Sequence, residues 1–83
     1  MTAPLRIEAG ELTAAELLAT MHDGRRVVIS VEVAGDTHEV VLRYDGETYL
    51  CDTPTRLHRH ANESEMRGCI DRMGYAADED EGF

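Results

Sequence analysis

Residues 26–52, which read RVVISVEVAGDTHEVVLRYDGETYLCD, decide the fold because they hold most of the β-branched residues of the chain. Val, Ile, Thr and Tyr fit the pleated surface of a sheet and predict strands wherever they cluster between turn signals. We expect three strands, at residues 26–33, 38–44 and 47–51. Consecutive strands joined by short turns form an antiparallel meander.

Two tight turns are expected to set the pairing of these strands. Asp45-Gly46 suits a two-residue type I′ turn, and Gly35-Asp36 is the expected tip of the turn formed by residues 34–37. The expected pairs are then Val33 with His38, Val31 with Val40, Ile29 with Leu42, Leu42 with Tyr49, and Val40 with Cys51.

Side chains alternate between the two faces of a sheet, so both turns predict the same apolar face. This face is expected to carry Val27, Ile29, Val31, Val33, Val40, Leu42, Tyr44, Tyr49 and Cys51. The opposite face is expected to carry Val28, Ser30, Glu32, Glu39, Val41, Arg43, Thr48 and Leu50.

Two amphipathic helices flank the meander. Thr13 and Glu16 form a capping-box pattern that predicts a helix running to about His22, with Gly24 just beyond its end. A second helix is expected to begin at Asn62 or Ser64, to run to Met73 and to end at Gly74. Their apolar stripes are Ala14, Leu17, Leu18 and Met21, and Met66, Cys69, Ile70 and Met73.

The whole pattern predicts a two-layer α+β fold in the order β-α-β-β-β-α. Residues 4–8 are expected to add an edge strand, giving an antiparallel sheet of three to four strands with both helices on one face. Thr53-Pro54 predicts one helical turn after the meander, and Tyr75 is expected to pack back on the body. Residues 1–76 form a single predicted domain, and residues 77–83 are expected to be a disordered acidic tail.

The charge is unusual for so short a chain. The formal net charge is −9, and all eight basic residues are Arg, since the chain has no Lys. Together with the segment CDTPTRLHRH at residues 51–60, this composition resembles short, acidic, uncharacterised proteins of halophilic archaea. The resemblance implies a source and a cytoplasmic location, and it assigns no functional residue. In such proteins, surface carboxylates mainly maintain solubility.

No segment resembles a signal peptide or a transmembrane run, so we expect a cytoplasmic protein without a membrane partner. The two cysteines, Cys51 and Cys69, are then expected to be reduced thiols.

Cys51, His58, His60 and Cys69 are candidate zinc ligands, because two thiolates and two imidazoles suit a tetrahedral site. Their spacing lacks the paired cysteines of a zinc knuckle. The alternative is that both thiols are small buried hydrophobes and both imidazoles lie at the surface.

Arg56, His58, Arg59 and His60 are a candidate binding site for an anion. Arg can hold a carboxylate or phosphate through parallel hydrogen bonds. The alternative is that these side chains neutralise nearby carboxylates such as Glu63 and Glu65. No glycine-rich phosphate loop or aromatic stacking platform accompanies them, so a nucleic acid is not the expected partner.

Val28, Val41 and Leu50 on the second face are a candidate self-association surface, although scattered surface hydrophobes would need no explanation. No catalytic motif is present. The sequence therefore predicts a non-catalytic interaction module, expected to form a homodimer, whose basic loop could bind a protein or an anionic ligand. The alternatives are a domain stabilised by zinc, and an anion-binding or nucleic-acid-binding protein.

The acidic composition generates a prediction about salt. We expect the melting temperature to rise steeply between dilute and molar KCl, because salt screens the repulsion among the carboxylates. Thermal unfolding followed by circular dichroism measures this change. A melting temperature that does not respond to KCl would contradict the halophilic interpretation.

Overall fold

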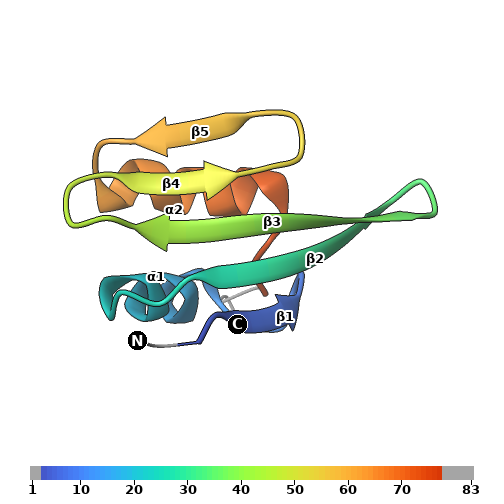
Figure 1. Cartoon of the computed structure of the whole chain (residues 1–83), viewed down its shortest axis with the longest axis horizontal. Helices are drawn as coiled ribbons and strands as arrows, with labels where there is room; N and C mark the ends of the chain where they lie inside the picture. Colours follow the sequence, from blue (N-terminus) through green and yellow to red (C-terminus); the bar gives the residue numbers. More distant parts are fainter. Residues whose placement is uncertain (1–2, 78–83) are drawn as a thin grey trace, which may run out of the picture.

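The computed structural model describes residues 3–77, which form a five-stranded mixed sheet and two helices (Figure 1). The elements in chain order are β1 (Leu5–Glu8), α1 (Ala14–His22), β2 (Val27–Val33), β3 (Asp36–Tyr44), β4 (Tyr49–Asp52), β5 (Leu57–His60) and α2 (Glu63–Met73). The strands lie in sequence order across the sheet. β1 is parallel to β2, and every other neighbouring pair is antiparallel. The fold is therefore α+β, as the sequence predicts.

Both helices begin and end as their sequences indicate. The backbone N–H of Glu16 donates to the Thr13 hydroxyl (3.2 Å), and the Glu16 carboxylate accepts from the Thr13 N–H (2.9 Å). For α2 the structure selects Asn62 over Ser64, since the Asn62 side-chain oxygen accepts from the Glu65 N–H at 2.9 Å. These bonds satisfy N–H groups that have no partner within the helix.

The first hairpin turn lies one residue earlier than expected. Ala34 and Gly35 are its central residues, with φ of 53° and 87°. Positive φ at both positions is the type I′ geometry that matches the twist of the flanking strands. Val33 therefore pairs with Asp36, and Val31 with His38. The expected pairing was wrong by two residues. Because side chains alternate between the two faces, a shift of two residues leaves every side chain on its expected face.

The second hairpin turn is longer than expected, because the Asp45 side chain organises it. One Asp45 carboxylate oxygen accepts from the N–H groups of Glu47 (2.9 Å) and Thr48 (2.7 Å), and these bonds lower the pKa of the carboxyl group. Tyr44 consequently pairs with Tyr49, and Leu42 with Cys51. This pairing also differs from the expected one by two residues, so the faces are again unchanged.

The segment after β4 forms a third hairpin rather than the expected helical turn. The Thr53 N–H donates to the Arg56 carbonyl (2.9 Å), while the Thr53 hydroxyl accepts from the Arg56 N–H (3.1 Å). Residues Leu57–His60 then pair with β4 as β5. The prediction of three to four antiparallel strands was therefore wrong. β5 was missed because its alternating imidazole and guanidinium side chains carry no apolar signal of period two.

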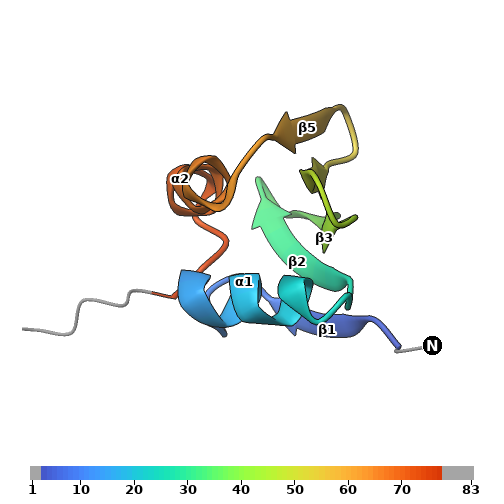
Figure 2. The same ribbon diagram turned by 90° about the vertical axis from the view of Figure 1, so that its left-hand side faces the viewer.

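One hydrophobic cluster fills the face of the sheet that carries Ile29 and Leu42, which we call the inner face. Figure 2 shows α1 and α2 beside the curved sheet, and their buried residues belong to the same cluster. The helices contribute Ala14, Leu17, Leu18, Met21, Met66, Cys69 and Ile70, and the sheet contributes Ile7, Val27, Ile29, Val40, Leu42, Tyr49 and Cys51. Tyr75 packs back into it, as the sequence predicts.

Two residues expected in the core are exposed instead. Val33 keeps 54% of its surface and Met73 keeps 44%. In Figure 1 the β2–β3 hairpin projects well past both helices, so nothing covers Val33 near its tip. Met73 is the last residue of α2, where the helix ends at the left-handed Gly74 (φ 75°). This exposed pair defines the site described below.

The cap of α2 provides a test of the fold. We expect Asn62→Ala to lower the free energy of unfolding by about 1 kcal/mol, because the Glu65 N–H loses its acceptor. Ser64→Ala is the matched control and should change the free energy of unfolding by less than about 0.5 kcal/mol, since Ser64 is exposed within the helix. Urea denaturation measures both values. An equal loss in the two variants would contradict the assignment of Asn62 as the cap.

Candidate binding groove

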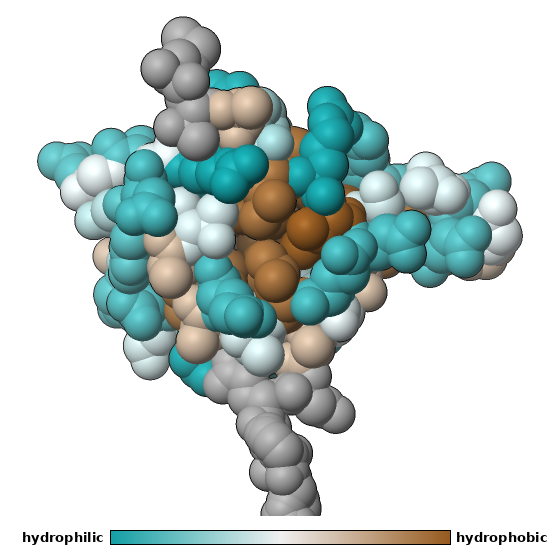
Figure 3. Space-filling model, turned by 90° about the horizontal axis from the view of Figure 1, so that it is seen from below, coloured by the Kyte–Doolittle hydropathy of each residue, from teal (hydrophilic) through white to brown (hydrophobic). Residues whose placement is uncertain are grey.

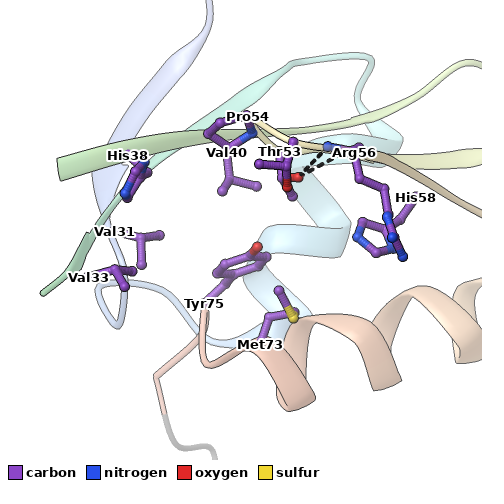
Figure 4. A pocket seen from close by; sticks show the side chains of 11 residues that line it. Val31, Val33, His38, Val40, Thr53, Pro54, Arg56, His58, Met73 and Tyr75 are labelled. Carbon is purple, nitrogen blue, oxygen red and sulfur yellow. Dashed lines mark hydrogen bonds between the residues drawn. The ribbon is translucent and has the colours of Figure 1, made fainter. Parts of the chain in front are cut away.

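A groove of about 460 Å³ lies at the end of the inner face that the helices leave uncovered. It is bounded by the β2–β3 hairpin, the turn between β4 and β5, and the C-terminal end of α2 (Figure 4). Its apolar lining consists of Val31, Val33, Val40, Pro54, Met73 and the ring of Tyr75, and its polar lining consists of His38, Thr53, Thr55, Arg56 and His58. The volume is within the range of small-molecule sites, which span roughly 300–1,000 Å³.

Exposed apolar side chains concentrate here. Val33 and Met73 are two of the large hydrophobic residues that residues 3–77 leave exposed, and both line the groove. Figure 4 shows them on different walls, Val33 on the hairpin and Met73 on α2. Figure 3 shows a hydrophobic patch beside the base of the hairpin, surrounded by hydrophilic side chains. An apolar patch with a polar rim is typical of a binding surface.

The cation at the rim is Arg56. Its backbone is held in the β4–β5 turn by Thr53, which accepts from its N–H and donates to its carbonyl oxygen (2.8 Å). Within residues 3–77 no carboxylate forms an ion pair with the Arg56 guanidinium. The neighbouring carboxylates expected to neutralise it are engaged elsewhere: Glu63 faces His22 at 3.7 Å, and Glu65 accepts from the Ala61 N–H at 3.0 Å.

Buried thiols lie behind the groove. Tyr75 lines it, and the Tyr75 hydroxyl is hydrogen-bonded to Cys51, which is fully buried next to Cys69. Burial and the neighbouring Cys69 raise the pKa of Cys51 to about 12, and burial raises the pKa of Tyr75 as well. Both thiols are free. At neutral pH Cys51 is therefore a protonated thiol, which is not a nucleophile.

The predicted zinc ligands do not converge. His58 pairs with Cys51 across β4 and β5, but the Cys51 and Cys69 side chains are buried in the core, whereas His58 and His60 are only half-buried. The two imidazole rings are parallel, with centroids 6.5 Å apart. Within residues 3–77 no three His, Cys, Asp or Glu side chains are grouped so that they could hold a metal ion.

The predicted anion site is divided by the strand that contains it. Successive residues of β5 point to opposite faces. His58 and His60 therefore share a face with Cys51 and Tyr49, their partners on β4, while Arg59 pairs with Leu50 on the other face. Only Arg56 and His58 of the four line the groove. Sequence analysis missed Val31, Val33 and Met73 as site residues because their apolar pattern assigned them to the core.

The predicted self-association residues lie on the expected face but are largely covered. Val28 and Leu50 keep only 7% and 6% of their surface exposed, and Val41 is half-buried. Arg6, which pairs with Val28, reaches across β2 to Glu39 at 3.5 Å. Its aliphatic stem can cover apolar surface while its charged end stays in water. The apolar trio is therefore not an open patch.

A polar aromatic cluster that the sequence did not indicate lies at the other end of β4. The Tyr49 hydroxyl and His22 Nε2 are 2.7 Å apart, and the rings of Tyr44 and Tyr49 stack with centroids 4.4 Å apart. Glu63 Oε1 lies 3.7 Å from the same nitrogen of His22. The cluster joins the end of α1 and the start of α2 to the sheet, and we assign it a structural role. Nε2 of the nearby His60 is buried without a hydrogen-bond partner.

Comparison with known proteins places the chain in a family. The model of a family of unknown function (DUF8001) matches residues 1–78. The chain belongs to this family. No curated protein and no solved structure matches it. Neither of the helices formed by residues 3–77 is long and apolar enough to cross a membrane.

The buried thiol generates a prediction about pH. The pKa of Cys51 is higher in the folded state than in the unfolded state. The protonated thiol therefore stabilises the fold fully below about pH 9, the ordinary pKa of a thiol, and this stabilisation is lost as the pH rises towards 12. We expect the melting temperature to fall by several degrees between pH 8 and 10.5. The Cys51→Ala variant should be less stable at pH 8, but its melting temperature should fall less over the same pH interval. Parallel pH profiles would show that Cys51 does not carry the effect.

Proposed function

We propose that the protein is a non-catalytic binding module whose groove takes a small organic anion with an apolar body. One observation carries this proposal: exposed Val33 and Met73 share one groove with Arg56, a guanidinium without a carboxylate partner among the described residues. A surface that combines uncovered apolar side chains with an available cation is complementary to a ligand that has both properties.

The two parts of the groove would make different contributions. Apolar surface removed from water contributes about 25 cal/mol per Å², so the Val31, Val33 and Met73 walls would supply affinity for the body of the ligand. Arg56 would select the charge. On a chain with a net charge of −9, an anion is repelled from most of the surface, so a single cation at the rim would direct it to the groove. His58 adds an imidazole that can donate a hydrogen bond.

A binding role agrees better with the groups in the groove than a catalytic one. Cys51 lies behind Tyr75 as a protonated thiol, since its pKa is raised to about 12. The Thr53 hydroxyl both accepts from and donates to the Arg56 backbone, so it is occupied by the turn. Cys51 is therefore not a thiolate, and the Thr53 hydroxyl is not free to act as a nucleophile.

A small anion also fits better than a nucleic acid, the alternative raised by the sequence. The basic residues of the β5 region are divided between two faces of the sheet, so they do not form a continuous track for phosphates. The phenol ring of Tyr75 lines the groove but is only 3% exposed, so it offers bases almost no surface for stacking.

The probe for this proposal is 8-anilinonaphthalene-1-sulfonate, an apolar molecule with one negative charge. We expect Arg56→Gln to weaken its binding about fivefold, the loss expected for one exposed charge-assisted hydrogen bond. Val33→Asp should weaken binding further, because it places a carboxylate on the apolar wall. Fluorescence titration measures affinity, and far-UV circular dichroism verifies that each variant is folded.

Arg59→Gln is the matched control for the fluorescence titration. It removes the same charge from the same region, but Arg59 lies on the opposite face of β5. Affinity should remain at the wild-type value. An equal loss in the Arg56→Gln and Arg59→Gln variants, or no loss in either, would contradict binding in the groove.

A further inference from the structure

The face of the sheet opposite the helices, which we call the outer face, packs against neither of the two described helices. In Figure 1 the viewer looks onto this face, with α2 behind β3 and β4. The buried residues of both helices belong to the inner cluster, whereas Val28 and Leu50 of the outer face do not. The charged side chains of this face, rather than its buried apolar residues, are therefore the groups available to a partner.

The strand register sorts the charges of the outer face by sign, which the order of residues along the chain does not show. Leu50 pairs with Arg43 on one side and Arg59 on the other, so one row across the sheet is basic. The next row of this face runs through Arg6, Val28, Val41, Asp52 and Leu57. The row beyond it carries Glu8, Ser30 and Glu39 and is acidic. The outer face thus has a basic end, an acidic end and a middle row in which Arg6 and Asp52 accompany the apolar residues.

We infer that the outer face binds a second copy of this chain, with the two β3 strands antiparallel and crossing at Val41. Glu39 and Arg43 lie two residues to either side of Val41 on the same face. A two-fold axis that lies between the sheets and perpendicular to the strands places Arg43 of each copy over Glu39 of the other, which gives two ion pairs. The axis also places Asp52 over its own equivalent, so the two ion pairs have to outweigh this repulsion. The opposite orientation, with parallel strands, places Arg43 over Arg43.

The charged groups required by this arrangement are accessible. The Glu39 side chain is 59% exposed, and its contact within the chain is a 3.5 Å ion pair to the largely exposed Arg6. Arg43 is half-buried on the same face, and Leu57, which lies beside Asp52 at the edge of the sheet, is 39% exposed. Because Val28 and Leu50 are already covered, the ion pairs rather than a large apolar area set the orientation.

The edges of the sheet are poor routes to self-association. At β1 the Glu11 side chain accepts from the Glu8 N–H (2.8 Å), and the Glu11 N–H donates to the Glu8 carbonyl (3.1 Å), which closes that edge. At β5, two antiparallel copies in a continuous sheet pair residues of the same face, and a pairing centred on Arg59 places Arg59 opposite Arg59. Like charges directly opposite each other are destabilising. The outer face is the remaining surface.

Analytical ultracentrifugation in 0.1 M KCl tests the inference. We expect the wild-type protein to form dimers, and both Arg43→Glu and Glu39→Arg to weaken dimerisation at least roughly tenfold. The double variant restores opposite charges between the copies and should recover most of the affinity. A wild-type protein that is monomeric at about 1 mM, or a double variant no tighter than the single variants, would overturn the inference.

Two comparisons distinguish dimerisation through the outer face from ligand binding in the groove. Arg56→Glu changes the net charge by the same amount as Arg43→Glu but lies at the groove, so dimerisation should be unaffected. Conversely, Arg43→Glu should leave the affinity for 8-anilinonaphthalene-1-sulfonate unchanged. If Arg56→Glu weakened dimerisation as strongly as Arg43→Glu does, the effect would come from net charge, and the proposed pairing of Arg43 with Glu39 would be wrong.

Discussion

The helices are too short to cover the sheet that they pack against, and the rest of the structure depends on this mismatch. β3 has nine residues, which extend about 30 Å, whereas nine-residue α1 and eleven-residue α2 are only about 14 and 16 Å long. Hydrophobic packing is therefore complete around Leu42 and stops before Val33. The groove is the part of the inner face left over, and the residues that line it are apolar because they continue a core strand.

The two faces of the sheet differ in chemistry because they are covered differently. Packing against helices excludes water from the inner face, which explains the raised pKa of Cys51 and Tyr75 and the protonated state of the thiol. The outer face remains in water, so it carries ionised side chains, with Arg43 and Glu39 on either side of Val41. A small domain thus presents two surfaces of different chemistry, an apolar groove on one face and charged side chains on the other.

Two of the three hairpins differ from the sequence prediction because of side-chain hydrogen bonds in their turns. The Asp45 carboxylate and the Thr53 hydroxyl each hold a turn by bonding to nearby backbone groups, and these bonds decided the length of one hairpin and the existence of another. Both errors in strand pairing were of two residues, so the division into faces survived. The missed strand mattered more, because its alternation separates Arg59 from His58 and divides the expected anion site.

The sequence by itself determined the α+β class, both helix boundaries and the two faces of the meander, because these depend on local caps and on a period of two that a shift of two residues preserves. Tertiary structure alone decided which apolar residues stay exposed and which charges become neighbours. Val33 would be buried in the core if a helix extended over it. It lines the groove because both helices, which are formed by other parts of the chain, end before they reach it. Whether Arg43 and Arg59 lie in one row depends on strand pairing, which joins residues that the sequence keeps apart.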